Sequence, residues 1–344
     1  MWPWFFITLI SIAVVLTIHT LRQPPPGTKV DHQPLQGWPA YKMAFMASDG
    51  RIIDTGNHHV SHSEGQGYGM LFAVNADDPS SFEKIWQWTH QHLQIRDDAL
   101  LAWRYQPGSG VTDINNASDG DILVAWALLQ AGQRWKKSHY IDDSRQILQD
   151  IRNKLIRPWR ELEILLPGVM GFERGPDDYT VNLSYWIFPA FRDFQIYDPS
   201  PQWSALEQSG LQLIRQSRFG RWQLPPDWLR LDQSVQPAPD RPPRFGYDAI
   251  RVPLHLSWAG INQIEFIQPF TLYQQAMYQR EQRLPPWINL TTNDIASYDA
   301  ANGIKAVFTH LKRPITAPGL PGPHDDYYSA SLLLLVELSQ QKRL

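Results

Sequence analysis

The chain has 344 residues, of which 28 are proline, 15 are tryptophan and none is cysteine. Without cysteine it has no disulfide framework, no thiolate nucleophile and no cysteine-ligated metal centre. The 31 Lys and Arg nearly balance the 34 Asp and Glu, giving a net charge of −3, so we expect no nucleic-acid partner. The 43% hydrophobic content suits a folded chain with a substantial core. The tryptophans either stack on flat, uncharged ligands such as sugars or fill a helical core.

The N-terminus carries an apolar stretch. Residues 2–18 contain no charged side chain and are followed by Arg22 and a proline run. We predict a signal peptide or N-terminal membrane anchor over residues 1–22, then a Pro-rich linker over 23–34. The stretch lacks a basic n-region and an obvious cleavage site, and at roughly 17 residues it lies at the lower limit for spanning a bilayer. A cleaved signal, a retained anchor and a buried core helix all remain open. The first two predict an exported, periplasmic protein that is soluble or tethered, with membrane contact only through this segment.

Apolar periodicity predicts one mainly helical domain over residues 35–344. We predict about ten or more helices. Nine are placed, in chain order, at 69–75, 81–92 (with Ser80 or Ser81 as N-cap), 121–135, 142–156, 185–194, 203–217, 261–278, 298–311 and 329–339. Strand-like alternation is local, at 222–224 and 228–231, and no repeat of fixed period is present. We therefore predict an all-α toroid or solenoid with long loops that shape one face and carry the chemistry.

The segment SEGQGYGM, residues 63–70, has three alternating glycines beside Glu64. Glycines allow a sharp turn and a close approach to a neighbouring segment. A carboxylate beside such a turn can point into a cleft and lose part of its hydration, which raises its pKa toward that of a general acid. The spacing does not fit a phosphate-binding loop. Glu64 is a candidate acid, although a tight turn before a helix with an incidental glutamate explains the segment as well.

The segment ASDGD, residues 117–121, precedes a nearly continuous apolar run. Ser118 as N-cap and Asp121 three residues later would form a capping pair, and acidic residues there suit the helix dipole. That interpretation leaves Asp119 unexplained. An additional acid beside a glycine, at the mouth of a hydrophobic helix, is a candidate for the site.

The segment FGYDAIR, residues 245–251, places Asp248 and Arg251 three residues apart, close enough to pair on a helical turn. An arginine beside a carboxylate keeps it ionised near neutral pH, as a general base requires. An ordinary surface ion pair would show the same spacing.

Three histidines, His58, His59 and His62, lie just upstream of the first motif. His58 and His62 are four residues apart, but no HExxH arrangement and no cysteine accompany them, so we expect a loop near a polar cleft rather than a metal site. The chain also has no G-x-S-x-G motif for a serine nucleophile.

In this order, SEGQGYGM, ASDGD with its following helix, and FGYDAIR resemble the motifs of glycoside hydrolase family 8. The resemblance runs from about Tyr41 to the C-terminal YYSASLLLLVEL. It implies an all-α fold, the (α/α)6 barrel of helix hairpins, in which long loops and a few short strands form a cleft at one end.

By position, the resemblance implies that Glu64 is the general acid and Asp248 the general base, while Asp119 holds the distorted sugar before the cleaved bond. The side chains it implies for substrate binding are Trp103, Tyr185, Arg251 and Tyr68, with a further contact from either Tyr327 or Tyr328. Judged singly, each of these aromatic residues fits the core better than a ligand-binding surface.

The implied activity is that of an inverting endo-1,4-β-glucanase linked to bacterial cellulose biosynthesis and secretion, with no cofactor. Inversion needs carboxyl groups roughly 6.5–9.5 Å apart, so tertiary structure has to bring Glu64 and Asp248 together. The implied partners are a β-1,4-glucan chain and the cellulose synthase complex. Two alternatives stay open: a family 8 enzyme specific for xylan or chitosan, and a non-catalytic glucan-binding subunit of the synthase.

Overall fold

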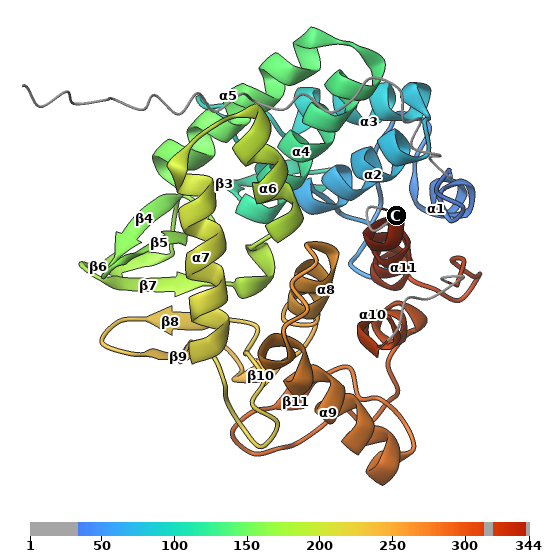
Figure 1. Ribbon diagram of the computed structural model, residues 1–344. Coiled ribbons are helices and arrows are strands. Elements are labelled where there is room, and N and C mark those ends of the chain that lie inside the picture. Colours follow the sequence, from blue (N-terminus) through green and yellow to red (C-terminus); the bar gives the residue numbers. More distant parts are fainter. Residues whose placement is uncertain (1–33, 313–318, 342–344) are drawn as a thin grey trace, which may run out of the picture. The chain divides into compact units, whose positions relative to one another are not determined.

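The computed structural model describes residues 34–312 and 319–341, which belong to one compact unit running from Pro34 to Leu344 (Figure 1). The predicted export segment at 1–22 and all of the linker except Pro34 lie outside the described residues. Within the two described ranges, no helix is both long and apolar enough to cross a bilayer.

The described part of the chain is mainly helical, as predicted. Its helices are α1 (Trp38–Phe45), α2 (Ser63–Asn75), α3 (Pro79–His92), α4 (Ser118–Trp135), α5 (Ser138–Lys154), α6 (Phe188–Tyr197), α7 (Pro201–Gln216), α8 (Arg251–Trp258), α9 (Ile264–Glu281), α10 (Asn302–Lys312) and α11 (Tyr327–Gln341), with a short 3-10 helix at Leu183–Tyr185. All nine predicted helices are present with shifted ends. The short helices α1 and α8 were not predicted.

The glycine-rich segment is helical, so its prediction as a turn is wrong, whereas the predicted close approach is confirmed. A Cβ added at Gly67 would lie 2.5 Å from Leu123 Cβ of α4, and one added at Gly69 would lie 2.7 Å from a side-chain carbon of Ile52. Glycine thus lets α2 and α4 pack backbone against side chain. The apolar run of α4 is buried from Ser118 to Leu129, because neighbouring helices cover most of its sides.

The strands are more numerous than predicted, and all of them pair antiparallel. They are β1 (Ser61–His62), β2 (Ala102–Gln106), β3 (Gly110–Asn116), β4 (Ile156–Trp159), β5 (Leu162–Leu165), β6 (Glu173–Gly175), β7 (Asp178–Val181), β8 (Leu229–Leu231), β9 (Val235–Pro237), β10 (Arg244–Phe245) and β11 (Ile288–Asn289). They form four small sheets, and β4 to β9 gather at one side of Figure 1. Strands this short show too little alternation to be recognised in the sequence.

Two predicted helix caps are wrong. Asp78, not Ser80 or Ser81, caps α3, and its side chain accepts a hydrogen bond from the Ser81 amide at 3.0 Å. Proline at the first position of α3 favours a start one residue after Asp78. At α4 the N-cap residue is Ala117, which has no side-chain cap.

Asp121 serves a different purpose from the predicted capping pair. Its carboxylate accepts hydrogen bonds from the Leu101 amide at 2.8 Å and from Asn116 Nδ2 at 2.7 Å. The side chain therefore ties the start of α4 to the residue just before β2 and to the end of β3, because a buried carboxylate binds whatever donors the tertiary packing supplies.

Candidate active site

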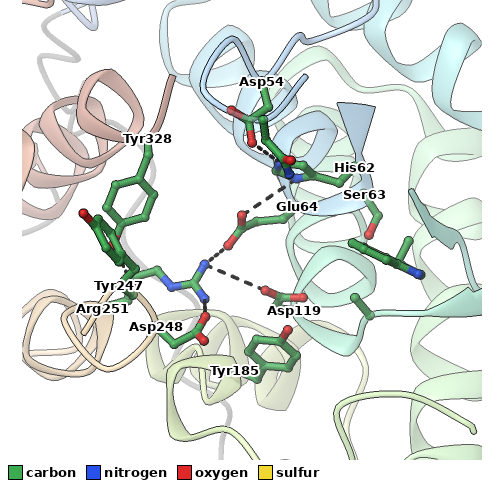
Figure 2. Close-up of a pocket in the computed structure, with 13 residues that line it drawn as sticks. Asp54, His62, Ser63, Glu64, Asp119, Tyr185, Tyr247, Asp248, Arg251 and Tyr328 are labelled. Atoms are coloured by element: carbon green, nitrogen blue, oxygen red, sulfur yellow. Dashed lines mark hydrogen bonds and ion pairs between the residues drawn. The ribbon is translucent and has the colours of Figure 1, made fainter. Parts of the chain in front are cut away.

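A pocket of about 380 Å³ lies where α2, α4 and α8 begin, and it gathers residues from all three sequence motifs (Figure 2). Six of the seven predicted site residues line it: Glu64, Trp103, Asp119, Tyr185, Asp248 and Arg251. The seventh, Tyr68, is buried behind the wall and donates a hydrogen bond to Glu64 Oε1 at 3.3 Å. Tyr68 therefore supports the predicted acid rather than facing a ligand in the pocket.

Glu64 lies in the first turn of α2. The N-cap residue, His62, accepts a hydrogen bond from the Gly65 amide through Nδ1 at 3.1 Å, and its Nε2 lies 3.3 Å from Asp54 Oδ2. Because Nδ1 accepts, the proton of the neutral ring is on Nε2, facing Asp54. These bonds fix the turn from which Glu64 projects into the pocket.

Asp119 is brought beside Glu64 by the contact between the starts of α4 and α2. A Cβ added at Gly120 would lie 2.6 Å from Ser63 Cβ and 2.8 Å from the Glu64 amide nitrogen. Only a glycine at position 120 leaves room for this approach. The carboxylate of Asp119 is 7% exposed and accepts a hydrogen bond from the Gly120 amide at 2.8 Å.

Asp248 lies in the turn between β10 and α8. Buried Asp227 fixes that turn, because its Oδ1 accepts hydrogen bonds from the Gly246 and Ala249 amides, both at 2.9 Å. The predicted pair is confirmed, since Arg251 Nη2 donates to Asp248 Oδ1 at 2.9 Å. It is not a surface ion pair, because the Arg251 side chain is only 6% exposed.

The Arg251 guanidinium lies among all three predicted carboxylates (Figure 2). Nη1 contacts Glu64 Oε1 and lies 3.9 Å from Asp119 Oδ2, while Nη2 binds Asp248. Nη2 also donates to Ser184 Oγ at 3.0 Å. One buried cation thus balances a group of acids that would otherwise repel one another.

Two of these acids, Asp119 and Asp248, have a pKa above the ordinary value of an aspartate. Burial raises the pKa of the Asp119 carboxyl to about 6. Burial, with the nearby charges of Asp227 and Asp119, raises the pKa of Asp248 to about 8. Carboxyls that titrate near neutral pH can exchange protons during a reaction, which is typical of acid–base sites.

Aromatic side chains complete the walls. The Trp103 indole donates to Asp113 Oδ2 across the β2–β3 hairpin at 2.8 Å, which fixes the ring. Tyr185 comes from the 3-10 helix and lies near Asp119 and Asp248 in Figure 2. The C-terminal tyrosine that lines the pocket is Tyr328, whereas Tyr327 is buried and packs edge-on against His62 with ring centroids 5.4 Å apart.

Several lining residues were not predicted as site residues, notably Asp54, Asn57, His62 and Tyr247. Their positions next to the glycine-rich and FGYDAIR motifs were the available signal. The predicted position of the histidines near a polar cleft is confirmed for His62, which lines the pocket and also caps α2, while His58 is exposed in a left-handed backbone conformation with φ of 52°. Within residues 34–312 and 319–341, no group of three or more His, Asp or Glu is arranged to hold a metal ion.

The chain matches the family described as "Glycosyl hydrolases family 8" over residues 28–342. It is 39% identical over 312 residues to a "Probable endoglucanase" of Novacetimonas hansenii, which covers 89% of this chain and 90% of the relative. The fold is similar to endoglucanase Cel10 of Klebsiella pneumoniae (40% identity, TM-score 0.85, 90% of this chain and 99% of that chain). It is also similar to endo-β-1,4-glucanase CMCax of Acetobacter xylinum (39% identity, TM-score 0.83, 89% of this chain and 97% of that chain).

Proposed function

Because the chain belongs to glycosyl hydrolase family 8, we propose that it is an endo-1,4-β-glucanase that cleaves internal bonds of cellulose chains. The observation that carries the proposal is the meeting of Glu64, Asp119 and Asp248 around Arg251 in one pocket. A β-1,4-glucan is uncharged, which suits aromatic walls and a near-neutral protein.

In the proposed reaction, Glu64 protonates the oxygen of the departing glucosyl unit. Asp248 removes a proton from the water that attacks the anomeric carbon from the opposite face, so the configuration inverts. With a pKa of about 8, Asp248 is mainly protonated at neutral pH despite the Arg251 hydrogen bond, so the expectation that Arg251 keeps it ionised there is wrong. Its ionised fraction, which serves as the base, increases as the pH rises. Inversion is implied by the family resemblance, and the configuration of the first-formed product tests it.

The other predicted residues act on the sugar and on the water. Asp119 would bind a hydroxyl of the sugar that is distorted before cleavage, and Trp103 would stack on a neighbouring glucosyl unit. Tyr185 and Arg251 flank the base and would orient its water. Because Asp119, Trp103 and Arg251 are held by hydrogen bonds to the scaffold, little reorganisation of these groups is needed in the transition state.

The same proposal includes the (α/α)6 barrel as the scaffold. Contacts link α2 with α4, α4 with α6, α6 with α8, α8 with α10, α10 with α11 and α11 with α2, which supports closure of an inner ring of six helices. Helices α1, α3, α5, α7 and α9 each pack against a member of that ring. A closed ring explains how residues 64 and 248, far apart in the chain, reach one pocket.

We further propose that the enzyme works outside the cytoplasm, trimming or releasing chains during cellulose secretion. The apolar stretch at 2–18 supports export. Finding the mature protein to begin at Met1 in membranes would identify an anchor, and a start downstream of the apolar stretch would identify a cleaved signal. Co-purification with the cellulose synthase would support the partner.

The activity is tested with residues 23–344 on carboxymethylcellulose, beside Glu64→Gln and Asp248→Asn. Each substitution is expected to lower kcat by about 10²–10⁴-fold, because it removes one proton-transfer group. Asp142→Asn, at a side chain that is 65% exposed on α5, is the matched control and should keep full activity. Wild-type turnover in either site variant would refute the assignment.

Two further measurements separate the alternatives. Proton NMR of the first-formed anomer should show an α product from a β bond, and a β product would exclude inversion. Faster hydrolysis of xylan or chitosan than of cellulose would change the proposed specificity. Binding of glucan without any turnover would favour the accessory-subunit alternative.

A further inference from the structure

Tyr298 is a large aromatic residue that is 51% exposed and is nevertheless hydrogen-bonded to the wall of the pocket. Its hydroxyl lies 3.0 Å from the hydroxyl of Tyr247, and Tyr247 lines the pocket beside Asp248. An exposed tyrosine loses favourable burial, so one held next to a site is a candidate for contact with a ligand.

Hydrogen bonds fix the backbone of the loop that carries Tyr298. Arg283 Nη1 donates to the carbonyl oxygens of Ala296 at 2.7 Å and of Tyr298 at 2.8 Å. The next residue, Asp299, accepts from the Leu284 amide at 3.0 Å. These bonds hold the backbone on both sides of the exposed ring, which lowers the entropy that a bound ligand would have to remove.

Tyr298 extends a row of tyrosines that starts inside the pocket. Tyr328 donates from its hydroxyl to the Tyr247 carbonyl at 2.5 Å, and the two rings meet edge to face at 5.5 Å. Figure 2 shows Tyr328 and Tyr247 on the side of Arg251 away from Asp119. Because Tyr298 is hydrogen-bonded to Tyr247 and is half exposed, the row connects the pocket with the surface.

The pocket is too small to enclose a long substrate, so a long chain has to extend beyond it. A cavity of about 380 Å³ lies near the lower end of the roughly 300–1,000 Å³ that small-ligand sites occupy. A polymer that passes through it has to continue over the neighbouring surface at each end. On the tyrosine side, that surface includes an exposed aromatic ring on a braced loop.

We propose that Tyr298 is a distal glucan-binding position, where its ring stacks on a glucosyl unit beyond those held in the pocket. The inference rests on the proposed function and specifies which substrates are preferred: chains long enough to reach past Tyr247. Tyr298 touches no reacting atom, so it contributes to the binding of long chains and not to bond cleavage.

The test compares cellotriose to cellohexaose as substrates for the unsubstituted enzyme, Tyr298→Ala and Tyr298→Phe. Tyr298→Ala should raise KM for cellohexaose by about 3–10-fold, the effect of losing one aromatic contact, with kcat unchanged and no effect on the shortest oligosaccharide that is cleaved. Tyr298→Phe keeps the ring and should retain most of the affinity. Tyr197→Ala, at an aromatic residue that is 42% exposed at the end of α6, is the control and should behave like the unsubstituted enzyme.

Binding of cellohexaose to the Glu64→Gln variant, with and without Tyr298→Ala, separates the two proposals. If Tyr298→Ala weakens the binding of cellohexaose, the distal position is supported even if the enzyme hydrolyses no cellulose. The lack of hydrolysis would overturn only the proposed activity. Active enzyme whose preference for chain length is the same with and without Tyr298→Ala overturns only the distal position. The absence of any binding to cellohexaose overturns both.

Discussion

Replacing Gly120 with alanine would place a methyl carbon 2.0 Å from Ser63 Oγ, 2.6 Å from Ser63 Cβ and 2.8 Å from the Glu64 amide nitrogen. The hydroxyl can rotate away, but the Cβ and the amide move only with the backbone of α2. Ordinary contact begins at 3.4 Å, so the start of α2 has to retreat by about 0.8 Å to accept the methyl group.

Stability and activity should respond differently to Gly120→Ala. Overpacking costs about 1–3 kcal/mol, whereas alanine improves helix propensity by up to about 1 kcal/mol, so the net loss in unfolding free energy is about 0–2 kcal/mol. Displacing Glu64 by close to an ångström should cost about 100-fold in kcat. We expect a folded protein whose melting temperature falls by a few degrees and whose activity on carboxymethylcellulose is nearly lost.

The matched controls use the same chemistry at other positions. Gly322→Ala adds a methyl group whose nearest neighbour is 3.5 Å away, so it should change neither property. Combining Ser63→Gly with Gly120→Ala removes the Cβ contact and should recover part of the activity. If Gly120→Ala keeps kcat within threefold of wild type, the contact between α4 and α2 does not position Glu64 and the reasoning is refuted.

Four further predictions concern buried titratable groups. Asp227→Asn removes a charge that raises the pKa of Asp248, so the rising limb of kcat/KM against pH should move to lower pH, and an unmoved limb would contradict the role of Asp248 as base. Asp121→Asn leaves the Asn116 amide without its acceptor, so the unfolding free energy measured by urea titration should fall by about 1–3 kcal/mol. An unchanged unfolding free energy would show that the carboxylate is dispensable. Burial raises the pKa of Asp121 to about 7, above its unfolded value near 4, so its share of stability should decrease as pH rises from about 4 to 7; Asp121→Asn should flatten that slope. Burial lowers the pKa of His255 to about 3, so stability should also fall as pH drops below about 6.5, and a His255→Gln variant that keeps the same acid slope would show that another group is responsible.

Local spacing determined the helices and the Asp248–Arg251 pair. Side chains three residues apart meet on a helical turn whatever surrounds them, and apolar residues at helical spacing need a buried face. The alternating glycines likewise indicated close packing, although they lie within α2 rather than in a turn. The motif order, by its resemblance to a known family, added the roles that spacing could not supply.

Partners that are distant in the chain were not readable from spacing. Asp121 looked like half of a capping pair, yet it binds Leu101 and Asn116, because a buried carboxylate takes the donors that neighbouring strands present. The choice between Tyr327 and Tyr328 also depended on packing. Consecutive helical residues point about 100° apart, so only the orientation of α11 shows that Tyr328 faces the pocket.

The composition by itself determined two things. A chain without cysteine has no disulfide scaffold, and a chain with nearly balanced charges has no excess of positive charge to bind a polyanion. Tertiary structure decided that Arg251 lies among Glu64, Asp119 and Asp248, which come from the first turns of α2 and α4 and from the turn before α8. The physical reason is that composition and local periodicity act over a few residues, whereas a site built from residues 64 to 251 exists only once packed helices hold their ends together.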